Sequence, residues 1–352
     1  MDNRQRFDPT KLITFSSKVL QKLGVPEEDA DITARILVAC DLRGVESHGV
    51  AHLGPFYANW IKQGTLNVKP KLRVSSYSPS TAVMDGDAGL GFVAGYHAML
   101  DAIERAKKTG TGLVTVKNSK HFGAATYYAM MALEYDMIGI AMTVGGRMMM
   151  APGSKGRAGG LNPIAVAVPA GKKHPFVLDM STSVVAGGKI EIAKRQGKSI
   201  PEGWVVDDNG KPITDPSLIN FRDPNWHGGI LPLGGSPALG SYKGFGLSVL
   251  VDILATVLSG AAPNTSANHL FIAIRIDGFR PVDGFKKQMD ELIDSIETLP
   301  TLPGVNKVYA AGGLEEEIVK DRTAKGIPLD EAVIQTLKDL SKEQGVEYDI
   351  DF

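Results

Sequence analysis

Residues 112–143 read GLVTVKNSKHFGAATYYAMMALEYDMIGIAMT, and this stretch decides the fold class. Residues 112–117 and 137–143 are short apolar runs, which are typical of strands. Residues 124–135, which lie between them, have the pattern of a helix. A strand, a helix and a second strand in direct succession predict an α/β fold.

The same alternation continues on both sides of this stretch. Apolar runs with turn residues between them predict strands at residues 82–86, 164–169, 176–180 and 270–276. Helical patterns predict helices at residues 95–109 and 184–196, and a long helix from about residue 243. Residues 201–240 are rich in Pro and Gly and are predicted to form loops. The middle of the chain is therefore predicted to be an α/β domain.

The segments on either side of this domain are predicted to be helical. Residues 8–23 and 26–40 have apolar positions at helical spacing, with Gly24 and Pro26 as punctuation between them. Residues 50–63 predict a third helix. The chain is thus expected to be helical to about residue 70, and mostly helical again after the last strand.

Composition and charge narrow the classes of function. The 352 residues are 43% hydrophobic and 22% charged, which is typical of a globular protein. The 38 Lys and Arg residues balance 39 Asp and Glu residues, which argues against nucleic acid and anionic membranes as partners. The apolar run at residues 244–262 is interrupted by Asp252 and predicts a buried helix instead of a membrane span. A single cysteine, Cys40, and the lack of a secretory signal predict a cytoplasmic location.

A dinucleotide-binding fingerprint is missing. The nearest match to Gly-x-Gly-x-x-Gly is GLGFVAG at residues 89–95, where the third glycine comes one residue late. A turn followed by the start of a helix explains these glycines, so a Rossmann pyrophosphate loop is not predicted.

The stretch RGVESHGV at residues 43–50 places His48 between two predicted helices. An imidazole with a pKa near 6.5 can donate or accept a proton near neutral pH, as carbonyl reduction requires. A histidine that only caps a helix would give the same pattern. His52 lies four residues after His48, so both could face one side of a helix and bind zinc. Because Gly49 stands where metalloproteases have Glu, a metal-dependent lyase or hydrolase is kept only as an alternative.

Two polar segments each follow a predicted strand and precede a predicted helix, which is a position where ligands bind. They are NSKHFG at residues 118–123 and LDMSTS at residues 178–183. The hydroxyls and amides of the second segment could bind phosphate or ribose oxygens, and Asp179 could accept a ribose hydroxyl. Lys189, two turns into the next helix, could face the same cleft. Helix capping alone would explain Asp179 and Ser181.

Together these segments resemble the type-2 malate/L-lactate dehydrogenase family, which includes sulfolactate and ureidoglycolate dehydrogenases, diketogulonate reductase and cyclic ketimine reductases. Eight segments match in family order: DLRGVESHGV (41–50), NSKHFG (118–123), NPIA (162–165), LDMSTS (178–183), PEGW (201–204), PLGG (232–235), YKGFGL (242–247) and GIPL (326–329). The resemblance covers nearly the whole chain.

The resemblance implies an α/β (α+β) fold that is not a Rossmann fold. A central mixed-sheet domain, residues 75–284, would bind NAD or NADP. It would pack with a helical domain made from residues 1–74 and 285–352. The resemblance also implies a homodimer with active sites near the interface, and a small-molecule substrate.

The resemblance further implies roles for residues. His48 would exchange the proton with the substrate, and Ser47 would orient it. His121 would lie at the nicotinamide or the substrate, and Lys189 would help to stabilise the developing charge. The cofactor would contact His121, Thr143, Asp179, Met180, Ser181, Thr182, Ser183, Tyr242, Lys243, Gly312, Gly313 and Leu314. No metal is expected.

Departures from the family pattern concern the substrate. His52 stands where family members often have the Arg that binds a substrate carboxylate, and Phe56, next to Tyr57, stands where they often have Tyr. The predicted substrate contacts are therefore Arg43, His52 and Arg147, with Arg147 as a replacement for the missing Arg. The expected reaction is hydride transfer between nicotinamide and a 2-hydroxy or 2-oxo acid. The alternatives are a cyclic ketimine reductase, the metal-dependent enzyme above and a nucleotide-binding relative without activity.

Overall fold

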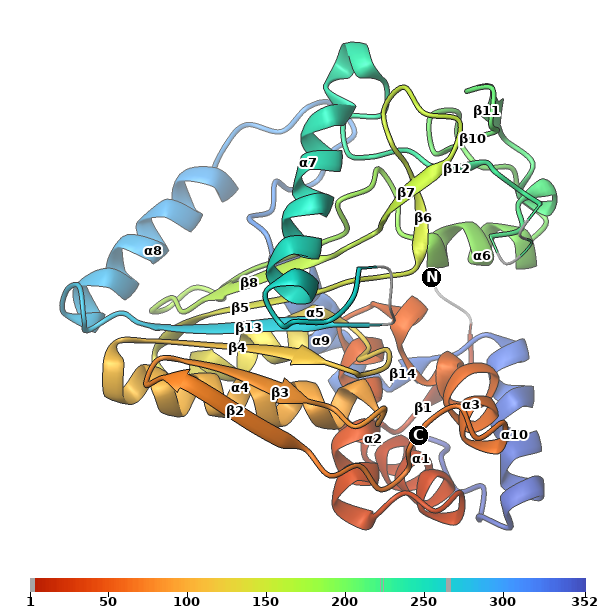
Figure 1. The fold of residues 1–352 in the computed structure, drawn as a ribbon, viewed down its shortest axis with the longest axis horizontal. Helices are drawn as coiled ribbons and strands as arrows, with labels where there is room; N and C mark the ends of the chain where they lie inside the picture. Colours follow the sequence, from red (N-terminus) through yellow and green to blue (C-terminus); the bar gives the residue numbers. More distant parts are fainter. Residues whose placement is uncertain (1–3, 222, 224, 264–266) are drawn as a thin grey trace.

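The centre of the molecule is a seven-stranded mixed sheet, seen in a computed structural model that describes residues 4–221, 223, 225–263 and 267–352 (Figure 1). The strand order is β2-β3-β4-β13-β5-β8-β9. The strands are β2 (Arg73–Ser78), β3 (Thr81–Asp85), β4 (Thr111–Lys117), β5 (Met137–Thr143), β8 (Ile164–Val168), β9 (Phe176–Met180) and β13 (His269–Arg275). Only β3 and β4 are parallel neighbours in this sheet. The predicted α/β fold with a mixed central sheet is confirmed, and this sheet is not a doubly wound parallel one.

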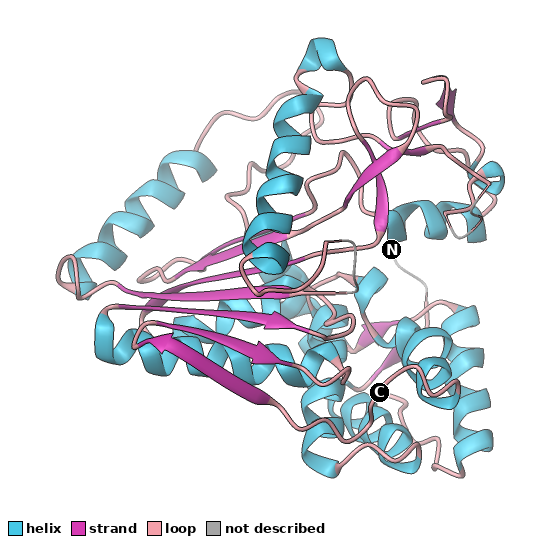
Figure 2. Ribbon diagram, in the orientation of Figure 1, coloured by secondary structure: helices cyan, strands magenta, loops and turns pink. Residues whose placement is uncertain are grey.

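Helices cover both faces of this sheet. α4 (Gly91–Thr109) and α5 (Ala125–Met131) pack on one face, and η4 (Ala132–Tyr135) follows α5. Glycines in the strands allow a close approach, because a Cβ on Gly112 would lie 1.9 Å from the Ala102 oxygen, and one on Gly139 would lie 2.0 Å from the Ala129 oxygen. On the other face lies the π-helix η7 (Asp252–Val257), which contacts β4 and β13, and α7 (Ser241–Val251), which leads into it, rises away from this face (Figure 2).

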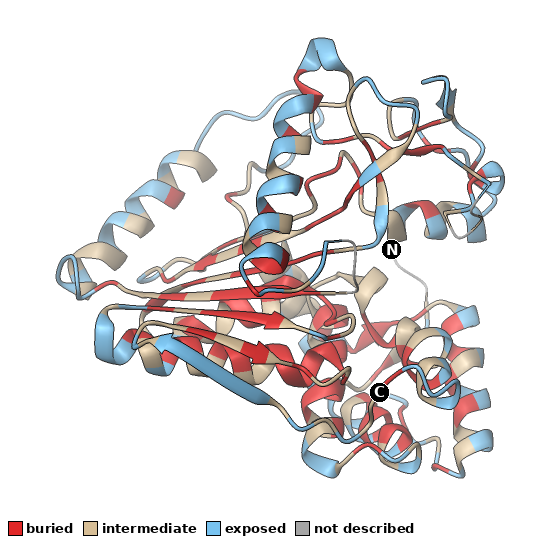
Figure 3. Ribbon diagram, viewed as in Figure 1, coloured by how far each residue is buried: buried red, intermediate tan, exposed pale blue. Residues whose placement is uncertain are grey.

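The N-terminal helices pack with the last part of the chain. The N-terminal elements are β1 (Arg6–Phe7), α1 (Pro9–Lys22), α2 (Glu27–Leu42), η1 (Glu46–His48), η2 (Val50–His52), the π-helix η3 (Leu53–Ala58) and α3 (Asn59–Lys62). The C-terminal elements are α9 (Gly313–Lys325), β14 (Ile327–Pro328) and α10 (Glu331–Gln344). β1 pairs with β14, α10 contacts α1 and η3, and α9 contacts α2. The buried surfaces of these helices and of the central sheet form one continuous core (Figure 3).

α8 (Val282–Glu297) lies apart from α9 and α10 (Figure 1). Its Asp290 accepts hydrogen bonds from the backbone N–H groups of residues 171–173, in the turn between β8 and β9. The domain boundaries at residues 74 and 284 remain a prediction, and α8 is attached to the central sheet at this turn.

The molecule has a second, smaller sheet of five strands, and the helix beside it belongs to the candidate site described below. Its order is β11-β10-β12-β6-β7, with β6 (Arg147–Met150), β7 (Arg157–Gly160), β10 (Val205–Val206), β11 (Pro212–Ile213) and β12 (Gly229–Ile230). Beside it are α6 (Gly187–Arg195), η5 (Pro216–Leu218) and η6 (Pro237–Leu239). The prediction of loops alone for residues 201–240 was wrong in part, because three very short strands lie there. No helix in the described part of the chain is long and apolar enough to cross a membrane.

Candidate functional site

Several of the predicted site residues, among them Thr143 and Asp179, come from one edge of the central sheet. β4 and β5 are both antiparallel to β13, and β5 and β9 are both antiparallel to β8, so β4, β5 and β9 point the same way. Their ends at Lys117, Thr143 and Met180 therefore lie along a single edge. The loop with His121 and the segment 181–183 both start from this edge.

Three histidines from two distant parts of the chain meet here, and we call His48, His52 and His121 the histidine cluster. The ring centroids of His48 and His121 are 5.4 Å apart, with an interplanar angle of 23°. The ring of His52 lies 5.9 Å from that of His48 and 6.1 Å from that of His121. The sequence predicted these residues from separate motifs, and the fold brings all three together.

Burial keeps the histidine cluster uncharged at neutral pH. It lowers the pKa of His48 to about 4. Burial, with the charges of His48 and Arg195, lowers the pKa of His52 to about 3. Burial and the neighbouring histidines lower the pKa of His121 well below its ordinary value. Neutral imidazoles can act both as proton acceptors and as hydrogen-bond donors.

The contacts of His121 determine which ring nitrogen carries its proton. Nδ1 of His121 accepts a hydrogen bond from the backbone N–H of Gly123 at 3.3 Å. An accepting nitrogen carries no proton, so the Tyr57 hydroxyl, 2.7 Å from the same nitrogen, donates to it. The proton of the neutral ring is therefore on Nε2, where it can be donated to a ligand.

The turn that carries His48 is held by a buried carboxylate. Asp41, at the end of α2, is buried, and its Oδ2 accepts the backbone N–H of Val50 at 2.8 Å. Burial raises the pKa of Asp41 to about 7. The carboxylate occupies the space beside Gly49, since a Cβ there would lie 1.9 Å from Oδ1 of Asp41. The φ of Gly49, −90°, is one that any residue can adopt, so the backbone conformation does not require glycine. Glycine is required because the Asp41 carboxylate leaves no room for a Cβ.

Polar neighbours hold the same turn from other sides. Oγ of Ser47 lies 2.9 Å from Nδ1 of His48, the distance that the predicted orienting role requires. Glu46 accepts hydrogen bonds from Arg322 at 2.5 Å and from Arg4 at 2.9 Å. Because Arg322 belongs to α9, the turn that carries His48 is attached to the C-terminal helices.

A fourth histidine supports the loop of His121. His269 is buried, with Nε2 3.0 Å from Oγ of Ser119 and Nδ1 2.7 Å from Oγ1 of Thr143. Its ring stacks on Phe122 at 4.5 Å between centroids. Burial lowers the pKa of His269 to about 3. The ring therefore joins Thr143, a predicted cofactor contact, to the loop that precedes α5.

Asp179 caps α5, an earlier helix of the chain, and not the helix after its own segment, which the capping interpretation of the motif concerned. Its Oδ2 accepts hydrogen bonds from the backbone N–H of Thr126 at 2.9 Å and from the hydroxyl of Thr126. The residue keeps part of its surface exposed, while burial of its carboxyl group raises its pKa and the hydrogen bonds from Thr126 oppose that rise. Of the two carboxylate oxygens, only Oδ2 is engaged by the described residues.

The hydroxyls of residues 181–183 differ in how far they are committed. Thr182 is buried, and its backbone N–H and hydroxyl both donate to the carbonyl oxygen of Leu161. Ser183 donates to the carbonyl oxygen of Val185 at 2.8 Å. Ser181 makes only a long contact of 3.5 Å to the Ser183 carbonyl oxygen and accepts from the Ser183 hydroxyl at 3.0 Å. Ser181 is thus the hydroxyl most available to a ligand.

The N-terminus of α7 is linked to the same segment. Leu233 donates its backbone N–H to the carbonyl oxygen of Thr182, and a Cβ on Gly244 would lie 2.4 Å from the Leu233 nitrogen. Tyr242 and Lys243, predicted cofactor contacts, begin this helix and are both exposed. They do not touch the histidine cluster in the described part of the single chain.

Arg43 lies with the predicted nucleotide contacts. Burial lowers its pKa, and the charges of Glu315, Glu316 and Asp179 oppose that effect. It lines a largely apolar pocket of about 450 Å³ between α2, α5 and α9, together with Thr126. Gly312, Gly313 and Leu314 form the start of α9, and a Cβ on Gly312 would lie 3.0 Å from Cβ of Val177 in β9.

Lys189 and Arg147 are both exposed, at different places. Lys189 follows Gly188, and a Cβ on Gly188 would lie 2.6 Å from Cβ of Ser47, so α6 packs directly on the turn that carries His48. Arg147 begins β6, and its charge acts on Asp252 of η7, whose pKa burial raises and Arg147 lowers. The structure therefore associates Arg147 with Asp252.

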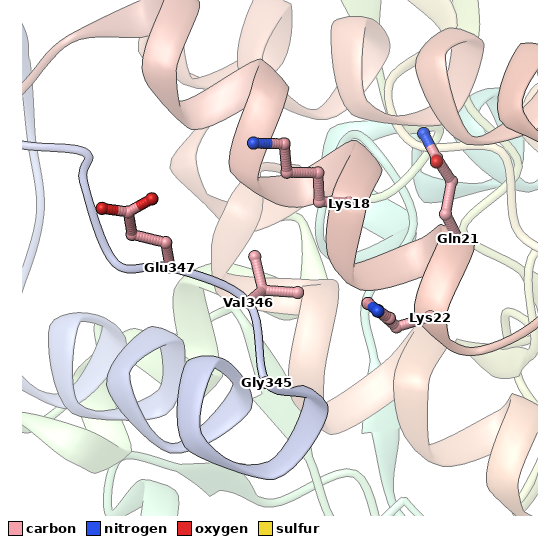
Figure 4. A pocket seen from close by; sticks show the side chains of 6 residues that line it. All are labelled: Lys18, Gln21, Lys22, Gly345, Val346 and Glu347. Atoms are coloured by element: carbon pink, nitrogen blue, oxygen red, sulfur yellow. The ribbon is translucent and has the colours of Figure 1, made fainter.

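Other parts of the described chain offer less chemistry. No group of three or more His, Cys, Asp or Glu side chains is arranged to hold a metal ion among residues 4–221, 223, 225–263 and 267–352. A second pocket, of about 440 Å³, lies between α1 and the segment after α10 (Figure 4). Its lining is Lys18, Gln21, Lys22, Gly345, Val346 and Glu347, and contains no predicted site residue.

Comparison with known proteins identifies the family. A family model described as malate/L-lactate dehydrogenase matches residues 7–338. The chain belongs to this family. The malate dehydrogenase of Pyrococcus abyssi is 43% identical over 357 residues, 98% of this chain and 96% of the relative. The L-sulfolactate dehydrogenase of Methanocaldococcus jannaschii is 40% identical over 340 residues, 93% of this chain and 94% of the relative.

The fold agrees with that of the malate/L-lactate dehydrogenase family. The crystal structure of malate dehydrogenase from Entamoeba histolytica matches 99% of this chain and 100% of its own, with a TM-score of 0.95 and 34% identity. The predicted resemblance is thus confirmed, and the chain is an oxidoreductase that acts on a CH–OH group.

Sequence reasoning missed several residues of this site. Asp41 and Glu46 lie within a matching motif, but only the folded turn reveals what they bind. The sequence signal for Tyr57 is its phenol hydroxyl. It directly follows Phe56, which stands where family members often have Tyr. His269 had no signal beyond being a histidine at the start of a predicted strand. No signal in the sequence points to Arg195, because it lies far from the three histidines along the chain.

Proposed function

We propose that this dehydrogenase transfers a hydride between a nicotinamide cofactor, NAD or NADP, and a 2-hydroxy or 2-oxo acid, with His48 as the group that exchanges the proton. The observation that carries this proposal is the histidine cluster, three neutral imidazoles at the edge where three strands end. When bound, the nicotinamide would supply or accept the hydride.

His48 is suited to the role of a base. With a pKa of about 4 it is unprotonated at neutral pH, so it can accept the hydroxyl proton of a 2-hydroxy acid. In the reverse direction the protonated ring would return that proton to the developing alkoxide. An anionic substrate beside the ring would favour its charged form and raise its pKa toward the working pH. Ser47 would hold the ring in position throughout.

His121 is suited to the role of a donor. Its Nε2–H would hydrogen-bond the substrate oxygen that becomes negatively charged. Oriented donors of this kind contribute a few kcal/mol because they are placed before the reaction begins. Tyr57 and the amide of Gly123 fix this tautomer by donating to Nδ1. Lys189, on the helix that packs against Ser47, would add a positive charge near the same oxygen.

The residues beside the cluster are suited to a dinucleotide. Oδ1 of Asp179, which accepts no hydrogen bond among the described residues, would accept a ribose hydroxyl, and Ser181 would contact the same part of the cofactor. The pocket beside Asp179 has a largely apolar lining and the size needed for a planar base. Thr143 ends β5, and His121 lies in the loop after β4, at the same edge of the central sheet.

The substrate is proposed to carry two anionic groups. Two relatives are named for malate and L-sulfolactate, and both of these molecules are 2-hydroxy acids with a second anionic group.

A cytoplasmic location is proposed as well.

A homodimer is proposed because one helix face has no cover in the single chain. Tyr242 is exposed at the start of α7, and exposed apolar side chains then recur every three or four residues from its last turn through η7: Leu250, Ile253 and Val257, with Val249 and Leu258 beside them. A stripe of this kind is typical of a helix that packs against another element. A second copy of the chain on this face would also cover Tyr242 and Lys243 and bring them near its active site.

A cofactor and substrate screen tests the proposal. The chain would be mixed with NADH or NADPH and with pyruvate, oxaloacetate, sulfopyruvate or a cyclic ketimine carboxylate, and absorbance of the reduced cofactor followed. Oxidation with a dianionic 2-oxo acid is expected. Turnover of the ketimine alone would favour the imine reductase, and turnover that stops on chelation would favour the metal-dependent enzyme. No turnover with any of them would contradict the proposal.

A further inference from the structure

A positive charge with no partner lies beside the histidine cluster. Arg195 ends α6, is exposed, and makes no ion pair or hydrogen bond within the described residues. The charge of Arg195 lowers the pKa of His52. It is a smaller cause of that shift than burial and the charge of His48. Glu191 precedes it by one helical turn, but the two do not form an ion pair in the structure.

Helix geometry explains why Arg195 faces this site. Gly188 of α6 lies against the catalytic turn, with a Cβ position 2.6 Å from Cβ of Ser47. Arg195 follows Gly188 by seven residues, about two turns, so both lie on the same face of the helix. Side chains of a helix tilt toward its N-terminus, which turns the Arg195 side chain back toward the turns η1 and η2. These turns carry His48 and His52.

His52 leaves a polar atom unsatisfied at the same place. Its Nδ1 is buried and has no hydrogen-bond partner within the described residues. Burying such an atom without a partner costs free energy, and a ligand that supplies one recovers it. A bound anion would be stabilised by the guanidinium of Arg195, and it would give Nδ1–H of the neutral His52 ring the partner that this atom lacks.

We propose that Arg195 binds the second anionic group of the substrate, the carboxylate or sulfonate farthest from the reacting carbon. This inference rests on the proposed function and names the residue that selects its substrate class. In the proposed mechanism His48 and His121 would hold the reacting oxygen. Arg195 is at the exposed end of α6, so it would meet the far end of an acid that reaches outward. A guanidinium fits both carboxylate and sulfonate oxygens.

The kinetic test compares Arg195→Gln with Lys194→Gln. Lys194 is the neighbouring residue, carries the same charge and donates to the carbonyl oxygen of Ile219 instead. Arg195→Gln is expected to raise the KM for oxaloacetate roughly ten- to a hundredfold, the size of a lost charge-assisted hydrogen bond, with little change in kcat. The KM for pyruvate, which lacks the second anion, should change little, and Arg195→Lys should restore part of the loss. Equal effects on both substrates, or an equal effect of Lys194→Gln, would overturn the assignment.

A second readout does not depend on turnover. The pKa of His52, followed by NMR, should rise in Arg195→Gln because a like charge is removed, and should stay unchanged in Lys194→Gln. Malonate should shift the His52 resonance in the wild type more than propionate does, and this difference should vanish in Arg195→Gln. If the chain turned over no 2-oxo acid, the proposed function would fail while this titration still decided where Arg195 acts. An unchanged His52 titration with an unchanged malonate effect would exclude Arg195.

Discussion

At the scale of single residues, the active site depends on polar groups that are buried close together. The histidine cluster is neutral because charged imidazoles would lose their hydration there. Asp41 fills the space beside Gly49, and Tyr57 sets the tautomer of His121. Each of these contacts leads to a specific expectation for a variant.

Gly49→Ala should displace Asp41 and destabilise the catalytic turn. The added methyl group would collide with a carboxylate that holds Val50, so the free energy of unfolding should fall by roughly 1–3 kcal/mol, as in other overpacked sites. Urea unfolding measures it. Gly246→Ala in α7 is the control, since no atom lies within 4 Å of its new Cβ, and it should be neutral or stabilising. Equal stability of Gly49→Ala and the wild type would show that the space is not filled.

His52→Leu should gain stability relative to the wild type as the pH falls. In the unfolded chain His52 has its ordinary pKa of 6.5, and in the folded chain about 3. Between these values the unfolded chain binds the extra proton, so this group's contribution to stability is lost as the pH falls. The variant lacks that loss, and its advantage should grow by roughly 1–2 kcal/mol between about pH 7.5 and pH 5. A difference independent of pH would mean that His52 titrates normally.

Prediction from sequence reached some of these residues and not others. His48, His52 and His121 stand in motifs that point to chemistry, so they could be named. Their neighbours in space could not, because contacts such as those of His269 with Ser119 and Thr143 join positions 150 and 126 residues apart in the chain. Periodicity and motif spacing carry no information at that range.

At the scale of elements, α6 packs against the turn that carries Ser47 and His48, and we expect it to hold that turn in place. Gly188→Ala should push this helix away from Ser47, because the new Cβ would lie 2.6 Å from Cβ of Ser47. We expect kcat/KM to fall at least tenfold, roughly the cost of about 1.4 kcal/mol in the transition state. Gly187→Ala is the matched control, with its nearest atom at an ordinary 3.5 Å, and should keep most of the activity. Similar losses in both variants, with both folded, would contradict this role of α6.

Elements with strong periodicity could be predicted well. The strand predicted at residues 137–143 coincides with β5, and the helices predicted at 8–23 and 26–40 became α1 and α2. Residues 50–63 are helical but divided into 3-10, π and α segments, since tertiary contacts such as that of Gly49 with Asp41 govern the backbone there. β2 was missed because most of its residues are exposed and it has no apolar alternation.

At the scale of the whole molecule, the exposed face of α7 and η7 predicts self-association. Ile253→Glu should convert a dimer into a monomer, because a charge would be buried without a partner in the contact. Sedimentation velocity at micromolar concentration measures the change. Tyr77→Glu on β2 is the control, since Tyr77 is 93% exposed and lies away from this face. A wild-type monomer, or a dimer unaffected by Ile253→Glu, would place the contact elsewhere or remove it.

The overall architecture was accessible from sequence through matching motifs, while local patterns supplied only the alternation of strands and helices. Strand order depends on pairings such as β13 between β4 and β5, which bring residues 269–275 between segments more than a hundred residues earlier. No local pattern encodes such an insertion. The family match predicted the type of fold, and the structure supplied the shared edge on which the site is built.

The most direct test of the central claim is the turnover of His48→Ala with the cofactor and substrate found in the screen. Loss of the proton-exchanging group should lower kcat roughly a hundredfold or more at every pH, while the dissociation constant of the reduced cofactor, from fluorescence titration, stays nearly unchanged. Turnover like that of the wild type, in a folded variant that binds the cofactor, would contradict the role of His48 and the mechanism built on it.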